Sequence, residues 1–171
     1  MRVILFRHGP AGEHDAERWP DDRHRPLTER GEARVRAAAR GLKRLEGELH
    51  AVLTSPLARC ARSAELLAAE AGADAAWEAL DALAPHGSWR DVIRRLGEES
   101  PDARVALVGH EPDLGKLAGV LLFGAPASLP LKKAGGCSIH FDGVVTAGSG
   151  RLRWFLPPRA LARVAAPRSK V

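Results

Sequence analysis

Three short segments with polar or basic side chains come directly after strand-like, mostly apolar runs. They are Arg7-His8-Gly9, Ser55-Pro56-Leu57-Ala58-Arg59 and Gly109-His110. A histidine with an unprotonated ring nitrogen is a nucleophile toward phosphorus, and arginine forks match the geometry of phosphate oxygens. Each segment alone is typical of a surface turn, an exposed arginine or a structural histidine. Together they supply a coherent set of groups for binding and transferring a phosphoryl group.

The elements that must position these residues follow from the alternation of strand-like and helix-like stretches, which favours an α/β sheet with crossover helices. We expect strands at residues 2–7, 51–54, 77–80 and 105–108, helices at 28–45, 55–71, 89–96 and 112–123, and late antiparallel edge strands at 138–141 and 152–156. Thr28 and Ser55-Pro56 carry helix-start signatures. Ligands bind at the carboxyl edge of such sheets, so we expect the three segments to meet there.

Composition limits the remaining possibilities. With 171 residues, of which 45% are hydrophobic, the chain suits one domain with a real core. We expect no membrane association, because no apolar run approaches about 18 residues. The first apolar run is too short for a signal peptide, and Cys60 and Cys137 have neither a disulfide-framework nor a zinc-site spacing. These features predict a cytoplasmic protein with reduced thiols.

The formal net charge of +5 arises mainly at the C-terminal end. Residues 151–171 hold six Lys or Arg and no Asp or Glu, which leaves 20 basic and 21 acidic residues over 1–150. Basic tails bind nucleic acids electrostatically, but this one lacks the aromatic interleaving of nucleic-acid binders. We therefore expect residues 159–171 to form a solvated basic tail and nucleic acid to be an unlikely partner.

The three segments, in this order, resemble the signature of the histidine phosphatase superfamily. Arg25-Pro26-Leu27-Thr28-x-x-Gly31 and the short length resemble the SixA-type phosphohistidine phosphatases within it. The resemblance extends from residue 1 to about residue 156. It implies a single histidine phosphatase domain over residues 1–158, folded as a phosphoglycerate-mutase-like three-layer α/β sandwich with a mostly parallel central sheet.

The resemblance also implies roles for individual residues. His8 matches the nucleophile that is transiently phosphorylated, and His110 matches the second pocket histidine. Arg7 and Arg59 match the phosphate-clamping arginines. Arg25 matches a further phosphate-facing arginine, and we place Gly9 with it among the substrate-binding residues. No cofactor and no metal is expected, and the implied partner is a phosphohistidine-bearing protein such as a phosphotransfer domain.

The sequence departs from the larger superfamily at the general acid. Phosphomonoester members use a Glu or Asp after the middle strand to protonate the leaving alkoxide. Residues 80–87, in the corresponding place, have no obvious carboxylate at the expected turn. Asp81, His86 and Glu13 are candidates, although each is more simply explained as structural or exposed. When the second ring nitrogen of phosphohistidine is protonated, the histidine side chain leaves as a neutral imidazole and needs no strong acid. The missing carboxylate therefore favours phosphohistidine as the substrate.

Several alternatives remain open at this point. The same chemistry could serve a small-molecule phosphomonoesterase acting on a sugar or nucleotide phosphate. A non-catalytic phosphate-binding regulatory module is a different class, and the intact nucleophile argues against it. Glu111 is expected to cap the helix that begins at Pro112, and Lys132-Lys133 to lie in a solvated loop. Trp19 and Trp89 could line the mouth of the site.

Overall fold

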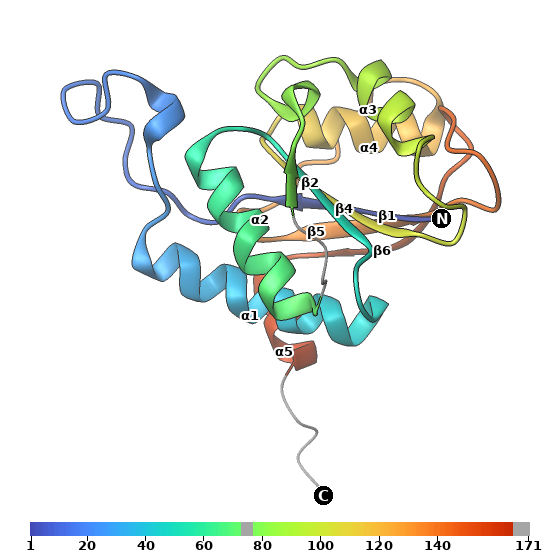
Figure 1. Ribbon diagram of the computed structural model, residues 1–171, viewed down its shortest axis with the longest axis horizontal. Helices are drawn as coiled ribbons and strands as arrows, with labels where there is room; N and C mark the ends of the chain where they lie inside the picture. The colour runs from blue at the N-terminus through green and yellow to red at the C-terminus, as the bar shows by residue number, and fades with distance from the viewer. Residues whose placement is uncertain (73–76, 166–171) are drawn as a thin grey trace, which may run out of the picture.

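The computed structural model describes residues 1–72 and 77–165, and Figure 1 shows one central sheet between two layers of helices. The strands are β1 (Arg2–Arg7), β2 (Ala51–Thr54), β3 (Trp77–Ala79), β4 (Arg104–Gly109), β5 (Gly136–His140) and β6 (Arg151–Leu156). Their order across the sheet is β3-β2-β4-β1-β5-β6. The first four strands in that order are parallel, whereas β5 and β6 are antiparallel to their neighbours. The expected α/β sandwich with a mostly parallel sheet is therefore confirmed.

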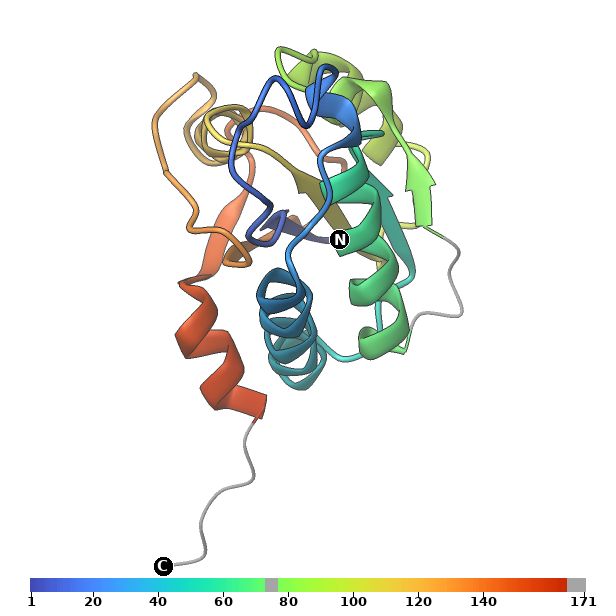
Figure 2. The same ribbon diagram turned by 90° about the vertical axis from the view of Figure 1, so that its left-hand side faces the viewer.

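Helices cover both faces of this sheet. The α-helices of the described residues are α1 (Glu29–Glu46), α2 (Ala58–Ala71), α3 (Trp89–Leu96), α4 (Asp113–Phe123) and α5 (Pro158–Ala165). Helices α1, α2 and α5 lie on one face, and α3 and α4 lie on the other (Figures 1 and 2). Within β1, Ile4 and Phe6 pack with α1 and α2, whereas Val3 and Leu5 pack with α3 and α4. Because both faces are buried, the strand has a continuous apolar sequence.

The register of the parallel strands brings the three chemical segments together. Arg7 of β1 is paired with Gly109 of β4, so His8 and His110 are the next residues along two adjacent strands. Strand β2 pairs with the other side of β4, and the Ser55 N–H donates to the Val108 carbonyl at 2.9 Å. The carboxyl edge of the sheet thus gathers the ends of β1, β2 and β4, as the sequence predicts.

Two predictions were wrong: the start of the second helix and the place of β5 in the sheet. Helix α2 begins at Ala58, with Leu57 at its N-cap and no capping side chain. Ser55 is fully buried and does not cap the helix. Strand β5 was expected at a sheet edge, yet it lies between β1 and β6, which leaves only β6 at that edge.

The C-terminal end also differs from the expected solvated tail. Residues 158–165 form helix α5, which packs against α1. Its Leu161 is fully buried, and an added Cβ on Gly41 of α1 would lie only 1.9 Å from the Leu161 carbonyl oxygen. The buried Leu161 therefore anchors a segment that also carries Arg159 and Arg163. The rest of the predicted tail, residues 166–171, lies outside the described residues. Over the described part of the chain, every helix is too short or too polar to cross a bilayer.

The Thr28-to-Gly31 motif attaches the loop after His8 to α1. Thr28 caps α1 as predicted, because its Oγ1 accepts from the Gly31 N–H at 3.0 Å, and its own N–H donates to the Pro10 carbonyl at 3.1 Å. A Cβ on Gly31 would lie 2.0 Å from that same Pro10 carbonyl oxygen. Only glycine allows the helix to approach the backbone two residues after the predicted nucleophile.

We therefore expect Gly31→Ala to destabilise the protein and impair its catalysis. The added methyl would displace Pro10, at a cost of about 1–3 kcal/mol for overpacking. Urea unfolding and turnover measured in parallel test this, with Gly143→Ala as the control, because a Cβ at Gly143 has no atom within 4 Å. Wild-type stability and turnover in Gly31→Ala would show that the close approach is not needed.

Candidate active site

His8 lies immediately after β1 and is only 5% exposed. Its Nδ1 lies 2.7 Å from the Gly9 carbonyl oxygen. A carbonyl only accepts, so Nδ1 carries the proton and Nε2 keeps its lone pair. Burial, reinforced by the nearby charges of Arg59 and Arg7, lowers the pKa of His8 to about 3. The ring is thus neutral near pH 7, with Nε2 available as a nucleophile.

A short chain of hydrogen bonds holds the Gly9 backbone, which in turn orients the His8 ring. The Gly9 N–H donates to Ser63 Oγ at 3.1 Å, and the Ser63 hydroxyl donates to the Arg59 carbonyl at 2.7 Å. Gly9 was predicted to bind substrate, but its N–H is already bonded inside the protein and it does not line the cavity around His8. The structure instead gives Gly9 the task of orienting His8, with Ser63 of α2 as its support.

His110 supplies a second neutral imidazole beside the first. The two ring centroids lie 5.1 Å apart. His110 Nε2 lies 2.9 Å from Ser55 Oγ and 3.3 Å from Cys60 Sγ, so both side chains hold the ring. Burial, and then the charge of Arg59, lowers the pKa of His110 to about 4. Burial also raises the pKa of the Cys60 thiol to about 12, which keeps that neighbour uncharged.

Arg7 and Arg59 are each held at the tip of the guanidinium group. Arg7 Nη1 donates to the Leu131 carbonyl at 2.8 Å. Arg59 Nη1 donates to the Asp22 carbonyl at 2.8 Å, and its Nη2 lies 3.0 Å from Asp22 Oδ2. The Nε atoms of both arginines are buried, and neither has a hydrogen-bond partner among the described residues. An oxyanion is the acceptor that two such charged donors match best.

These groups surround an open cavity of about 290 Å³. Its lining residues are Arg7, His8, Arg25, Arg59, Pro85, His86, His110, Glu111, Pro112, Asp113 and Lys133. Lys133 lies in a loop with an exposed side chain, as expected, and it also lines the cavity. Its partial burial and the charges of Arg7, Arg25 and Arg59 lower its pKa. The cavity therefore has four basic side chains and two carboxylic acids on its wall, which favours an anionic ligand.

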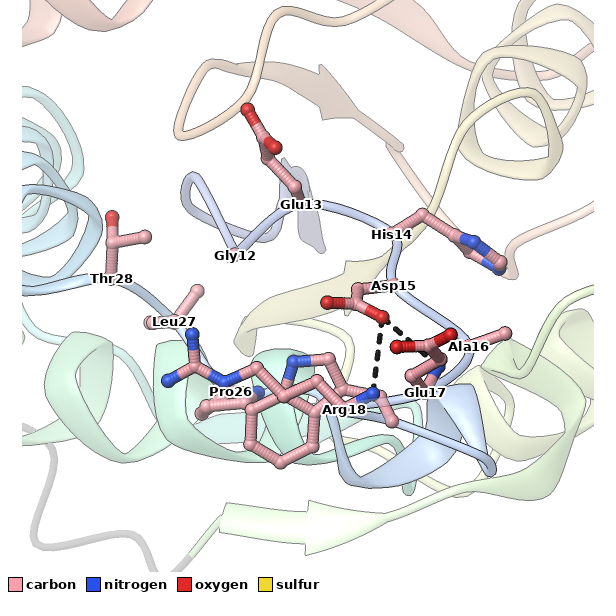
Figure 3. Close-up of a pocket in the computed structure, with 11 residues that line it drawn as sticks. Gly12, Glu13, His14, Asp15, Ala16, Glu17, Arg18, Pro26, Leu27 and Thr28 are labelled. Atoms are coloured by element: carbon pink, nitrogen blue, oxygen red, sulfur yellow. Dashed lines mark hydrogen bonds between the residues drawn. The ribbon is translucent and has the colours of Figure 1, made fainter.

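The three candidates for the general acid have different positions. His86 lines the cavity, and its backbone N–H donates to Asp113 Oδ2 at 2.9 Å. Asp81 lines two neighbouring hollows instead. Glu13 lines a larger groove of about 800 Å³, formed by residues 12–19 and 26–28 (Figure 3). Only His86 is therefore brought to the predicted site.

Two carboxylates near the arginines were not predicted as site residues. Glu111 accepts from the Gly115 N–H in the first turn of α4 and from the Leu131 N–H at 3.0 Å. It is not the N-cap, however, because Pro112 holds that position and the helix begins at Asp113. Burial raises its pKa. Asp22, in the loop between β1 and α1, contacts Arg25 and Arg59. That loop holds several acidic residues without periodicity, so the sequence does not distinguish Asp22 from the others.

The arrangement defines a class of site, in which a neutral histidine nucleophile lies beside the buried Arg59 and the half-buried Arg7 at the carboxyl edge of an α/β sheet. Such a site is built for phosphoryl transfer. Among the described residues, no three His, Cys, Asp or Glu side chains gather as metal ligands would. Residues 3–119 match the family model described as the histidine phosphatase superfamily, branch 1. The chain belongs to this superfamily, and it is a phosphatase of that class.

Known proteins of similar sequence and structure agree with this assignment. An uncharacterized protein from Picosynechococcus sp. is 42% identical over 139 residues, covering 79% of this chain and 82% of the relative. The solved structure of the protein histidine phosphatase SixA complexed with tungstate is 28% identical, with a TM-score of 0.81 over 94% of this chain and 99% of that one. A phosphoserine phosphatase from Entamoeba histolytica, at 15% identity, has the same fold with a TM-score of 0.66, over 92% of this chain and 98% of that one.

The two buried imidazoles should make stability depend on pH. Their folded-state pKa values lie below the ordinary value of 6.5, so below that pH the unfolded chain binds protons that the folded chain does not. Stability should therefore fall between about pH 6.5 and pH 4, by up to about 1.4 kcal/mol per pH unit for each histidine. Urea unfolding of wild type and His8→Asn at pH 7 and pH 5 tests this. Between the two pH values, His8→Asn should lose less unfolding free energy than wild type. Equal losses in the two proteins would contradict a depressed pKa at His8.

Proposed function

We propose that this phosphatase removes the phosphoryl group from phosphohistidine on a protein, through a covalent intermediate on His8. The observation that carries the proposal is the pair of buried Nε donors on Arg7 and Arg59, which have no partner in the described part of the chain, beside the unprotonated Nε2 of His8. A phosphate-binding module needs the arginines only. A nucleophile held in one tautomer adds the chemistry of transfer.

The proposed reaction has two steps, transfer of the phosphoryl group to His8 and hydrolysis of the phosphohistidine that forms. In the first, His8 Nε2 attacks phosphorus, the bond from phosphorus to the substrate nitrogen breaks, and the substrate imidazole leaves with that electron pair. In the second, a water oxygen attacks phosphorus and the bond to His8 Nε2 breaks. Phosphate leaves with one proton of the water, and the other goes to solvent. Arg7 and Arg59 offset the charge on the phosphoryl oxygens in both steps.

Three observations support a protein-borne phosphohistidine as the substrate class. The chain is similar over nearly its whole length to a protein histidine phosphatase. A cavity of about 290 Å³ is at the lower end of the range for small-molecule pockets, so it surrounds little beyond a phosphoryl group and a ring. The segment that supplies the acid in phosphomonoester enzymes here contributes His86 rather than Asp81. An imidazole leaving group has the smallest need for a carboxylic acid.

Glu111 favours a second candidate, a phosphomonoesterase for small molecules. Its carboxyl group lines the cavity, and burial raises its pKa, as a group that protonates an alkoxide requires. Two backbone N–H groups hold that carboxyl, however, and such bonds favour its ionised form. The phosphomonoesterase is therefore the weaker of the two candidates.

A substrate comparison tests the proposal. We expect kcat/KM for a phosphohistidine-bearing phosphotransfer domain to exceed that for phosphoserine or a sugar phosphate by at least about 100-fold, or roughly 2.7 kcal/mol. Glu111→Gln should leave the phosphohistidine reaction largely intact, because imidazole leaves without a carboxylic acid. Comparable efficiency on a small ester, combined with its selective loss in Glu111→Gln, would promote the second candidate. Phosphohistidine turnover that survives in His8→Ala would remove His8 from the mechanism.

A further inference from the structure

Asp22 is the point at which the long loop after β1 contacts the phosphate-clamping arginines. It begins a 3-10 helix, Asp22–His24, which contacts α2 (Figure 1). Arg59 meets Asp22 twice, at the backbone carbonyl and at Oδ2. Arg25 Nε donates to the other carboxylate oxygen, Oδ1, at 2.7 Å. One carboxylate thus joins two arginines that come from separate parts of the chain.

We propose that Asp22 is a positioning residue that holds Arg59 and Arg25 in the orientation that binds the phosphoryl group. The inference rests on the proposed function of the cavity. It goes beyond that function because it makes the affinity of the arginines for the anion depend on an acidic side chain that does not itself bind the anion.

The geometry distinguishes this role from that of a carboxylate that competes with the ligand. A guanidinium group has five N–H donors along two usable edges. Asp22 takes the tip of Arg59, through Nη1 and Nη2, and leaves the buried Nε unpartnered among the described residues. Arg7 shows the same division, because the Leu131 carbonyl accepts from its Nη1 and its Nε has no partner within residues 1–72 and 77–165. Asp22 therefore fixes the tip and leaves the Nε edge for an oxyanion.

The charges in the cavity give Asp22 a second effect on the arginines. Four basic side chains line the cavity, and the Arg59 side chain is only 6% exposed. A buried guanidinium without a counter-charge is costly, and a flexible one would turn away from its like-charged neighbours. The hydrogen bond from Arg25 and the charge of Arg59 lower the pKa of Asp22. Asp22 is therefore ionised near neutral pH and acts as a fixed counter-charge, not as a proton donor.

Arg25 depends on Asp22 in a similar way. Its Nε is bonded to Asp22, and its Nη1 donates to the Gly12 carbonyl at 2.7 Å. Both anchors belong to the loop between β1 and α1, whereas Arg59 belongs to α2. Asp22 therefore couples a loop arginine to a helix arginine, and losing it should weaken both contacts at once.

The adjacent Asp21 provides a matched control. It is one residue away, pairs with the exposed Arg23 at 2.7 Å, and has no contact with Arg25 or Arg59 among the described residues. We would measure tungstate inhibition, kcat and KM for wild type, Asp22→Asn, Asp22→Ala and Asp21→Asn. Asp22→Ala should weaken tungstate binding about 10- to 100-fold, with Asp22→Asn intermediate because it keeps one acceptor oxygen. Asp21→Asn should stay within about twofold of wild type.

A double-mutant cycle shows whether Asp22 acts through the arginines. In an Arg25→Ala/Arg59→Ala background, adding Asp22→Ala should change tungstate binding less than about twofold, because nothing remains to be positioned. Wild-type or tighter tungstate binding in Asp22→Ala would overturn the inference, and so would a full loss that persists in the double-alanine background.

Comparing Asp22→Ala with the single variant Arg59→Ala separates this inference from the proposed function. If Arg59→Ala alone leaves tungstate binding and turnover unchanged, the proposed function of the cavity fails. If Arg59→Ala is impaired while Asp22→Ala is not, only the role of Asp22 fails. Thermal unfolding of each variant identifies any loss that comes from misfolding, and Asp22→Asn, which keeps the shape of the side chain, retains the test if Asp22→Ala unfolds.

Discussion

Four basic side chains and two imidazoles share one small cavity, and their repulsion and desolvation must be offset before any ligand arrives. The protein does this without neutralising the cavity. Protein acceptors hold the tips of Arg7 and Arg59, and both histidines are buried in their neutral form. Among the described residues, the buried Nε groups of the two arginines are left without a hydrogen-bond partner. An anion with several oxygens satisfies them, so phosphate chemistry follows from the way in which the charges are held.

The sheet makes this arrangement possible, and that part could be predicted from the sequence. Residues that follow paired parallel strands always share one edge, so the apolar runs before His8 and His110 were sufficient to bring the two rings together. Ser55 was misinterpreted, because Ser-Pro before a helix is also the pattern of a cap. The folded structure shows instead that Ser55 is buried and that its hydroxyl is hydrogen-bonded to His110.

The residues that the sequence did not reveal lie on segments without periodicity. Asp22 reaches Arg59, and Lys133 reaches the cavity, because of the path of their loops, and neither a hydrophobic pattern nor a turn signal predicts that path. Helix α5 illustrates the same difficulty at the other end of the chain, where a segment expected as a solvated tail forms a helix that packs on α1 through the buried Leu161. For such positions, tertiary contacts decide the structure and local sequence does not.

In the proposed mechanism His8 attacks through Nε2, because its Nδ1 is bonded to the Gly9 carbonyl. The most direct test is a single-turnover reaction with a phosphorylated phosphotransfer domain, quenched in alkali and analysed for the position of the phosphate. We expect phosphate on His8, bonded to Nε2, and no trapped phosphate in His8→Ala. Phosphate on Nδ1, on another residue, or on no residue of an actively turning-over enzyme would contradict it.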